Sequence, residues 1–391
     1  MTDALFSGRF LSQGGDDFLA HGLGERVVHA DLGAEAVAPL LSWDDLNAIL
    51  STGTLQPPRL RLHRQGSAVP VECYTQTATV GGERRAVVRP VELYAQLRDG
   101  ASLIIEAIDW LHPPIRAAAD DLIRLVREPA QANMYLLWGE MHGFDAHWDD
   151  HDTVIVQVMG TKSWTVHGPG RTHPLRIDAS LDDICPTAIV WEGVLHAGHA
   201  LHVPRGWWHT VRGTGGVSLH LTFGFTRSTG IDWATRLVEH LRTLDLFRRD
   251  LPRFADREHS ADHYRQLLRQ LAVTAAAHGP AELLTEQNQH FGRRQRFSLP
   301  WPVHSALPAG TITVELATVI APVVTTTGDT VALTTGGKRY TFKAAARPAL
   351  DVLIRDREMT VAELGRRSGL GDTQLATLLR ELFRQHLLLV R

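Results

Sequence analysis

Residues 133–166 read NMYLLWGEMHGFDAHWDDHDTVIVQVMGTKSWTV, and this stretch predicts both the fold and the chemistry of the chain. Within it, His147 and Asp149 stand two positions apart. In an extended segment alternate side chains point to the same face, so we expect the imidazole and the carboxylate to lie together. They supply two of the three protein ligands of a two-histidine, one-carboxylate iron site.

The third ligand must come from a segment that returns alongside the first. Residues 198–211 read GHALHVPRGWWHTV, which indicates a strand, a Pro-Arg-Gly turn and a second strand. His209 follows the turn and is the predicted third ligand. His199 and His202 precede the turn and are expected to face elsewhere. His151 shares strand parity with His147, but three ligands on one straight strand would spread over about 13 Å, too far for one ion.

An H-x-D pair alone is a weak signal in a chain with 21 histidines and 43 acidic residues, where core histidines and a turn-capping Asp are the ordinary interpretation. The surrounding pattern adds to it. Residues 153–159 indicate a buried strand, and residues 160–164 a turn that starts another strand. Lys162 is a charge in this apolar run. It is either an ordinary lysine at a hairpin edge or a fixed cation for a carboxylate co-substrate.

Together these segments resemble the JmjC-type 2-oxoglutarate oxygenases, and most of all their ribosomal-oxygenase branch. The matches occur in the expected order: Asn133-Met-Tyr135, Gly143-Phe144, His147-Trp-Asp149, Gln157-Val-Met-Gly160, Lys162 with Trp164, Leu201 to His209, and Ser218-Leu-His220-Leu-Thr222. The fold of that family is a double-stranded β-helix. The short strands punctuated by Gly and Pro over residues 131–226 also favour a jelly roll of the cupin kind.

The resemblance implies that His147, Asp149 and His209 bind Fe(II), with 2-oxoglutarate and O2 as co-substrates. Lys162, thirteen positions after Asp149, would pair with the distal carboxylate of 2-oxoglutarate. Further co-substrate contacts would come from Asn133, Tyr135 and Thr222, with His220 near the metal. Trp148, Trp164, Trp207 and Trp208 are interpreted as packing residues.

The implied substrate is a protein side chain, His or Arg, hydroxylated at Cβ, and a ribosomal protein is the expected partner. Residues 166–198 diverge from the ribosomal type where substrate loops are expected. A peptide-tailoring hydroxylase of a biosynthetic pathway is therefore the alternative. A non-catalytic cupin and winged-helix regulator that senses a ligand is a second alternative, against which the intact triad and Lys162 argue. A zinc-bound cupin isomerase is a remote third, because open two-histidine, one-carboxylate sites suit Fe(II).

A chain of 391 residues is too long for one core, and we expect three parts. Residues 1–228 form the catalytic domain with helical and strand elaborations at its N-terminus. Residues 229–298 are helical, with an apolar stripe at Trp233, Leu237, Leu241 and Leu244. The resemblance makes this segment a homodimer contact, although packing within one chain fits the stripe too.

Residues 299–391 resemble a winged helix, with a hairpin turning at Gly336-Gly337 and three helices after it. The third helix, from Asp372 to Gln385, is apolar with two arginines. DNA-binding helices usually carry more Lys, Arg, Asn and Gln. We therefore expect a structural or substrate-docking module rather than a DNA-binding one.

Composition restricts the setting of the protein. The formal net charge of −3 suggests neither a nucleic acid nor an anionic membrane as partner. The two cysteines, Cys73 and Cys185, cannot make a disulfide framework and favour a reducing compartment. The N-terminus lacks a signal-peptide pattern, and no apolar run reaches the ~20 residues of a membrane-spanning helix. We expect a cytoplasmic protein with a mainly β core and added helices.

Overall fold

The computed structural model describes residues 4–15, 17–140, 145–180, 184–291, 296–303 and 310–390. Gly143 and Phe144 of the family pattern lie outside these residues. The chain forms two compact units, Met1–Arg227 and Ser228–Arg391. The further division of the second unit at residues 298 and 299 stays a prediction.

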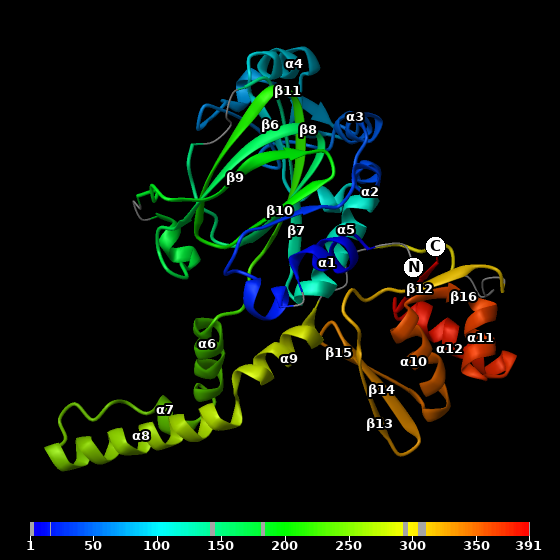
Figure 1. Ribbon diagram of the computed structural model, residues 1–391. Helices are drawn as coiled ribbons and strands as arrows, with labels where there is room; N and C mark the ends of the chain where they lie inside the picture. The colour runs from blue at the N-terminus through cyan, green and yellow to red at the C-terminus, as the bar shows by residue number, and fades with distance from the viewer. Residues whose placement is uncertain are drawn as a thin grey trace. The chain divides into compact units, whose positions relative to one another are not determined.

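The first unit is built on a nine-stranded sheet in which β8 and β11 are the two long strands (Figure 1). They run antiparallel beside each other, and the other edge of β8 pairs with β10 in its first half and with β9 in its second half. This arrangement confirms the predicted jelly-roll-like β core. The strands are β1 (Val28–Asp31), β2 (Leu60–Arg64), β3 (Ser67–Ala68), β6 (Ser102–Ile105), β7 (Ala130–Trp138), β8 (Asp152–Pro169), β9 (Ile189–His196), β10 (His199–Val203) and β11 (Trp207–Phe225).

A bulge at Val158 changes the alternation of side chains along β8. The predicted turn at residues 160–164 is wrong, because β8 continues through it as one strand of 18 residues. Val158 has no partner in the pairing with β11, where the register shifts. Before it, Thr153 and Ile155 face inward; after it, Lys162 does. A one-residue slip moves all later side chains to the other face, so this bulge turns Lys162 inward. Gly160 has a φ of +66° and lies opposite Ser218, at the end of the bulged part of β11.

The N-terminal segment packs beside helix α5 (Pro113–Val126). Phe6 makes an edge-on contact with Phe223 of β11, with ring centroids 5.0 Å apart. The buried carboxylate of Asp121 in α5 accepts hydrogen bonds from the backbone N–H of Phe6 at 2.7 Å and from the Ser7 hydroxyl at 2.6 Å. These contacts fix the start of the chain to the barrel, because breaking them would leave a buried carboxylate without partners.

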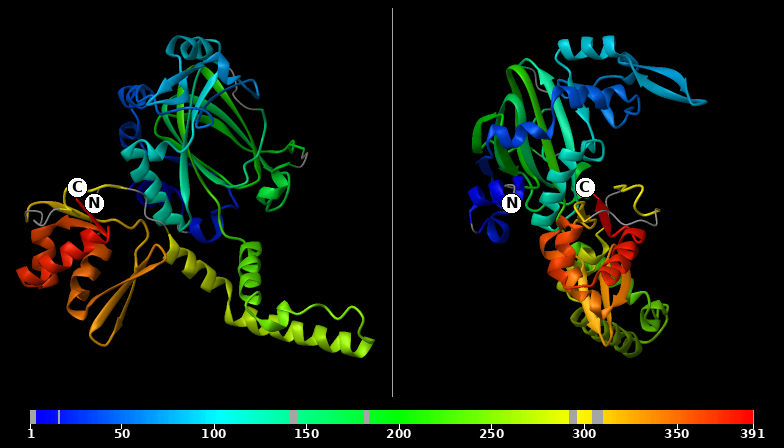
Figure 2. Two further views of the ribbon diagram at one scale, coloured as in Figure 1. Left: turned by 180° about the vertical axis from the view of Figure 1, so that it is seen from behind. Right: turned by 90° about the vertical axis from the view of Figure 1, so that its right-hand side faces the viewer.

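Other elements of the first unit surround the sheet. Helices begin after Ser42 and at Pro90, and the Ser42 hydroxyl accepts a hydrogen bond from the backbone N–H of Asp45. The β4–β5 hairpin, which the sequence did not indicate, extends away from the barrel (Figure 2). These elements are α1 (Leu11–Gly14), α2 (Ala34–Val37), α3 (Trp43–Ser51), β4 (Thr75–Val80), β5 (Glu83–Val88) and α4 (Pro90–Arg98).

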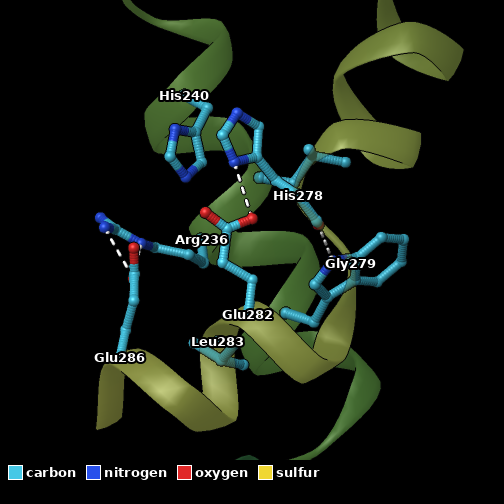
Figure 3. A pocket seen from close by; sticks show the side chains of 9 residues that line it. Arg236, His240, His278, Gly279, Glu282, Leu283 and Glu286 are labelled. Carbon is cyan, nitrogen blue, oxygen red and sulfur yellow. Dashed lines mark hydrogen bonds and ion pairs between the residues drawn. The ribbon is translucent and has the colours of Figure 1, made fainter. Parts of the chain in front are cut away.

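The second unit begins with four helices: α6 (Gly230–Leu241), α7 (Asp245–Arg248), α8 (Arg257–Ala277) and α9 (Pro280–His290). The apolar stripe expected from Trp233 to Leu244 does not lie on one helix, because α6 ends at Leu241. Figure 3 shows α6 beside the junction of α8 and α9, where the indole of Trp233 donates to the His278 carbonyl at 2.7 Å. Arg236 pairs with Glu286 at 2.8 Å. These two contacts attach α6 to both sides of the junction.

The rest of the second unit has two small sheets and three helices, as predicted after residue 300. Its core is formed by apolar side chains from all three helices and from β14, among them Val331, Leu350, Leu364 and Leu379. Among the described residues, no helix is both long and apolar enough to cross a membrane. The elements are β12 (Thr313–Leu316), β13 (Val323–Thr327), β14 (Thr330–Thr335), β15 (Lys338–Lys343), α10 (Arg347–Asp356), β16 (Glu358–Thr360), α11 (Val361–Ser368), α12 (Asp372–Arg384) and β17 (Leu388–Val390).

Substituting Gly160→Ala should destabilise the first unit. A Cβ at this position would lie 1.8 Å from the Val217 carbonyl oxygen, and φ is positive. We expect the free energy of unfolding, measured by urea denaturation, to fall by about 2–4 kcal/mol. The control is Gly216→Ala in the same region, where no atom lies within 4 Å of the added Cβ. Equal losses of unfolding free energy in the two variants would contradict the close packing of Gly160 against the Val217 carbonyl.

Candidate metal centre

Two backbone hydrogen bonds bring the predicted ligand segments together. The N–H of His147 donates to the His209 carbonyl at 3.2 Å, and the N–H of His209 donates to the His147 carbonyl at 2.8 Å. Gly206 donates to the Asp149 carbonyl at 2.9 Å. The segment around His147 is therefore an isolated β-bridge to the start of β11 rather than the strand expected from the sequence.

The side chains of His147, Asp149 and His209, here called the triad, converge on one position. One ligand atom from each lies within 4.8 Å of the others, and Nε2 of His209 is 3.8 Å from Oδ2 of Asp149. Nδ1 of His147 donates to the Asp145 carbonyl at 2.8 Å, and Nδ1 of His209 to the Trp207 carbonyl at 3.1 Å. Because a carbonyl only accepts, both imidazoles keep the Nε2 lone pair for a metal ion.

Electrostatics also suit the triad to a cation. Burial and the neighbouring His147 lower the pKa of His209, and the Asp149 carboxylate opposes them only partly. The imidazole of His209 is therefore neutral at pH 7, which is the form that binds a metal. The donor set is two imidazoles and one carboxylate, with the remaining coordination positions facing a cavity, as in non-haem iron sites.

The cavity has a volume of about 210 Å³. It contains the triad and four of the five other residues predicted from the sequence. The exception is Asn133, whose Oδ1 accepts from the backbone N–H of Ala107 at 3.0 Å. The described residues that line the cavity are Arg61, Ser102, Tyr135, His147, Asp149, Thr153, Ile155, Lys162, Trp164, His209, Val211, His220 and Thr222.

Arg61 and Ser102 were not identified from the sequence. They come from β2 and β6, and β6 pairs with β7 beside Tyr135. Arg61 forms an ion pair with Glu106. No local pattern marks either residue, since only the sheet order brings strands from residues 60–105 next to the H-x-D segment. The one feature of the sequence that could have indicated Arg61 is its positive charge on the short strand β2.

Lys162 is buried, with only 4 % of its surface exposed, and its Nζ lies 3.1 Å from Nδ1 of His220. Burial lowers the pKa of Lys162 to about 7. Burial first, and then the charge of Lys162, lowers the pKa of His220 well below its usual value. The neutral His220 ring therefore accepts a hydrogen bond from the Lys162 ammonium and holds it inside the cavity.

Tyr135 stacks on the imidazole ring of His220. Its ring is nearly parallel to that of His220, at 6°, with the centroids 4.9 Å apart. Burial, with a contribution from the Asp149 charge, raises the pKa of Tyr135 to about 12. The phenol therefore keeps its proton at neutral pH and is a hydrogen-bond donor beside Lys162.

Trp164 does more than the packing expected of it. Its ring stacks on His209, with centroids 5.8 Å apart, and meets His220 edge-on at 5.6 Å. Its indole N–H is buried and makes no hydrogen bond within the described part of the chain. Trp164 thus contacts both His209 and His220 in the lining of the cavity.

Comparisons with known proteins find similar sequences and a similar fold. The JmjC domain family matches residues 111–232. The histidyl-hydroxylase NO66 of Caenorhabditis briggsae, also described as a lysine-specific demethylase, is 36% identical over 109 residues, covering 26% of this chain and 14% of the relative. Human ribosomal oxygenase 1 is 32% identical over 136 residues, covering 32% of this chain and 21% of the relative. The chain thus spans about a fifth or less of the length of these curated relatives.

Solved structures show the same fold over almost the whole chain. The X-ray structure of YcfD from Escherichia coli has a TM-score of 0.58 at 18% identity and covers 96% of this chain and 97% of YcfD. A complex of YcfD, described as a ribosomal oxygenase, with cobalt and 2-oxoglutarate has a TM-score of 0.56 at 17% identity, with the same coverage. The match over residues 111–232 shows that this segment is similar to the JmjC domain, and the likeness to YcfD shows that the two chains share a fold.

Proposed function

We propose that this chain is an Fe(II)- and 2-oxoglutarate-dependent dioxygenase that hydroxylates a side chain of a protein. The observation that carries the proposal is the shared cavity: the triad and a buried lysine face the same 210 Å³ space. The relatives described as histidyl-hydroxylases and ribosomal oxygenases support it. So does YcfD, which has been solved with cobalt and 2-oxoglutarate.

In this proposal Nε2 of His147, Nε2 of His209 and the Asp149 carboxylate hold the iron. Fe(II) bound there with 2-oxoglutarate would allow O2 to act as the oxidant: one oxygen atom would enter a C–H bond of the substrate, and the other would enter the succinate that forms, with carbon dioxide, from 2-oxoglutarate. The two Nδ1–H groups, fixed by backbone carbonyls, hold both rings in the metal-binding orientation.

The distal carboxylate of 2-oxoglutarate would pair with Lys162, while Tyr135 and Thr222 donate hydrogen bonds. His220 would act through Lys162 by holding its amine in the cavity. Asn133, whose oxygen is bonded to Ala107, would act through its hydrogen bond to Tyr135 rather than by touching the co-substrate.

The substrate would be a histidine or arginine side chain of a ribosomal protein, and the cavity wall favours histidine. Among the described lining residues, the only carboxylate is Asp149, which the metal would use. Arg61 is on the same wall. A guanidinium group would meet this cation, whereas a neutral imidazole would not be repelled.

The helical segment is proposed to join two copies of the chain. Helix α8 has 21 residues, of which Thr274 alone is buried. Tyr264, Leu268 and Leu271 recur at helical spacing on one face and are all exposed. A second copy of this segment, with the same apolar face, would cover them, as expected for a symmetric contact.

The module after residue 299 is proposed to be a winged-helix-like docking domain rather than a DNA reader. The inner face of α12 is buried through Leu375, Leu379 and Leu382, and Arg384 on its outer face pairs with Glu381. This leaves little free positive charge for phosphates. Both cysteines are free thiols, which fits the proposed cytoplasmic setting.

Removing a triad ligand should abolish turnover. For His147→Ala and Asp149→Ala we expect succinate formation, with Fe(II), 2-oxoglutarate and histidine-containing ribosomal peptides, to fall at least about 100-fold. Mass spectrometry should find an added oxygen on histidine in the parent reaction only. The control is His151→Ala, a neighbouring histidine that does not line the cavity. Parent-level turnover in both triad variants would place the site elsewhere, and DNA retention without turnover would favour the regulator.

The affinity for 2-oxoglutarate should depend on pH through Lys162. Burial lowers the pKa of Lys162 to about 7, so the amine loses its charge as the pH rises above 7. We expect the KM for 2-oxoglutarate to rise roughly fivefold between pH 7 and pH 8, because the charged fraction falls by that factor. Lys162→Arg, which stays charged, should flatten this profile. A flat profile in the parent protein would contradict the proposed pairing.

The exposed face of α8 gives a test of the dimer. Leu268→Asp should convert the protein from dimer to monomer in light-scattering measurements of mass, because it places a charge in an apolar contact. Gln266→Asp adds the same charge to the opposite face of the helix and should leave the dimer intact. A monomeric parent protein would refute the proposal.

A further inference from the structure

Three histidines gather at the edge of the first unit, away from the lining of the cavity. His29 lies on β1, the terminal strand of the nine-stranded sheet. His199 is the first residue of β10, which pairs with β1, and His196 is the last residue of β9. The short connection between β9 and β10 brings these two histidines close. None of the three is among the described lining residues of the cavity.

The geometry of His29 and His199 suits a shared ion. Nε2 of His29 is 3.0 Å from Nδ1 of His199, and the ring planes meet at 60°. Two imidazole nitrogens on one tetrahedral zinc ion, each at 2.0–2.1 Å, are about 3.3 Å apart. The pair therefore needs to open by only a few tenths of an ångström to hold a metal ion in place of the present hydrogen bond.

Further donors surround this pair. The ring centroid of His196 is 5.3 Å from that of His199, and its side chain is exposed. Its ligand atom does not lie within 4.8 Å of those of both His29 and His199, so coordination requires a change of its side-chain rotamer. Asp31 lies on the same face of β1 as His29 and opposite His199 in the strand register. Burial and the neighbouring His199 lower the pKa of His29. This keeps its imidazole neutral at pH 7 and able to bind a metal.

A second histidine pair in the chain provides a contrast. His240 and His278 stack face to face, with centroids 3.8 Å apart and planes at 10° (Figure 3). Nitrogen lone pairs lie in the plane of an imidazole ring, so two parallel stacked rings cannot both point at an ion between them. His29 and His199 differ from this pair, because one ring nitrogen of each faces the other at 3.0 Å.

We propose that His29 and His199, with His196 as a third ligand, bind a divalent transition-metal ion of the zinc class. Imidazole donors suit Zn²⁺, Ni²⁺ and Cu²⁺. The ion would link the terminal strand β1 to β10 and β9, and would thereby strengthen the edge of the sheet. This site is separate from the triad, and the inference does not depend on the proposed oxygenase activity.

Titration of the metal-free, full-length protein with Zn²⁺ by calorimetry tests the proposal. We expect the parent to bind one equivalent more than His29→Ala or His199→Ala. His147→Ala should keep this equivalent, because it alters the triad only. His240→Ala, from the stacked pair, should bind as many ions as the parent. Equal stoichiometry in the parent, His29→Ala and His199→Ala would overturn the proposal.

Thermal unfolding gives a second measurement that does not depend on stoichiometry. His29 is exposed, so His29→Ala should keep the metal-free Tm of the parent. With Zn²⁺ at about 100 times its dissociation constant, the parent Tm should rise by roughly 5 °C. A rise of the same size in His29→Ala would show that the stabilising ion binds elsewhere and would refute the assignment.

Discussion

The site depends on the pair of backbone hydrogen bonds between His147 and His209. These bonds join a short segment without regular structure to the first residues of a long strand. They set the distance between the two imidazoles, and the bond from Gly206 holds Asp149 beside them. Side-chain contacts alone could not do this, since an H-x-D segment without a partner strand leaves its backbone groups unsatisfied. The metal-binding geometry is thus a consequence of backbone pairing.

A second constraint acts on the two long strands. Near the start of β11 the residues that face the cavity are odd-numbered, His209 and Val211, whereas near its end they are even-numbered, His220 and Thr222. The pairing of β11 with β8 shifts register between these two parts of the strand. The bulge at Val158 makes the matching change on β8. Both strands therefore change parity at one level of the barrel. As a result, Lys162 meets His220 in a buried hydrogen bond that offsets part of the cost of removing an ammonium group from water.

The sequence predicted the residues with distinctive chemistry and missed those defined by tertiary pairing. His147, Asp149 and His209 were recognisable from their spacing and the turn before His209, and Lys162 from its isolation in an apolar run. The Gly-Thr-Lys segment has the local composition of a turn, and only pairing with β11 and β9 keeps it in a strand. Arg61 and Ser102 reach the cavity through sheet order, which local patterns do not encode. The Asn133 side chain bonds to Ala107 for the same reason.

The most direct test of the central claim is the location of iron in crystals grown without oxygen in the presence of Fe(II) and 2-oxoglutarate. Anomalous scattering at the iron edge should give a peak bonded to Nε2 of His147, Nε2 of His209 and one oxygen of Asp149, with a carboxylate of 2-oxoglutarate on the Lys162 amine. A triad without iron, or a 2-oxoglutarate molecule bound away from Lys162, would contradict the account.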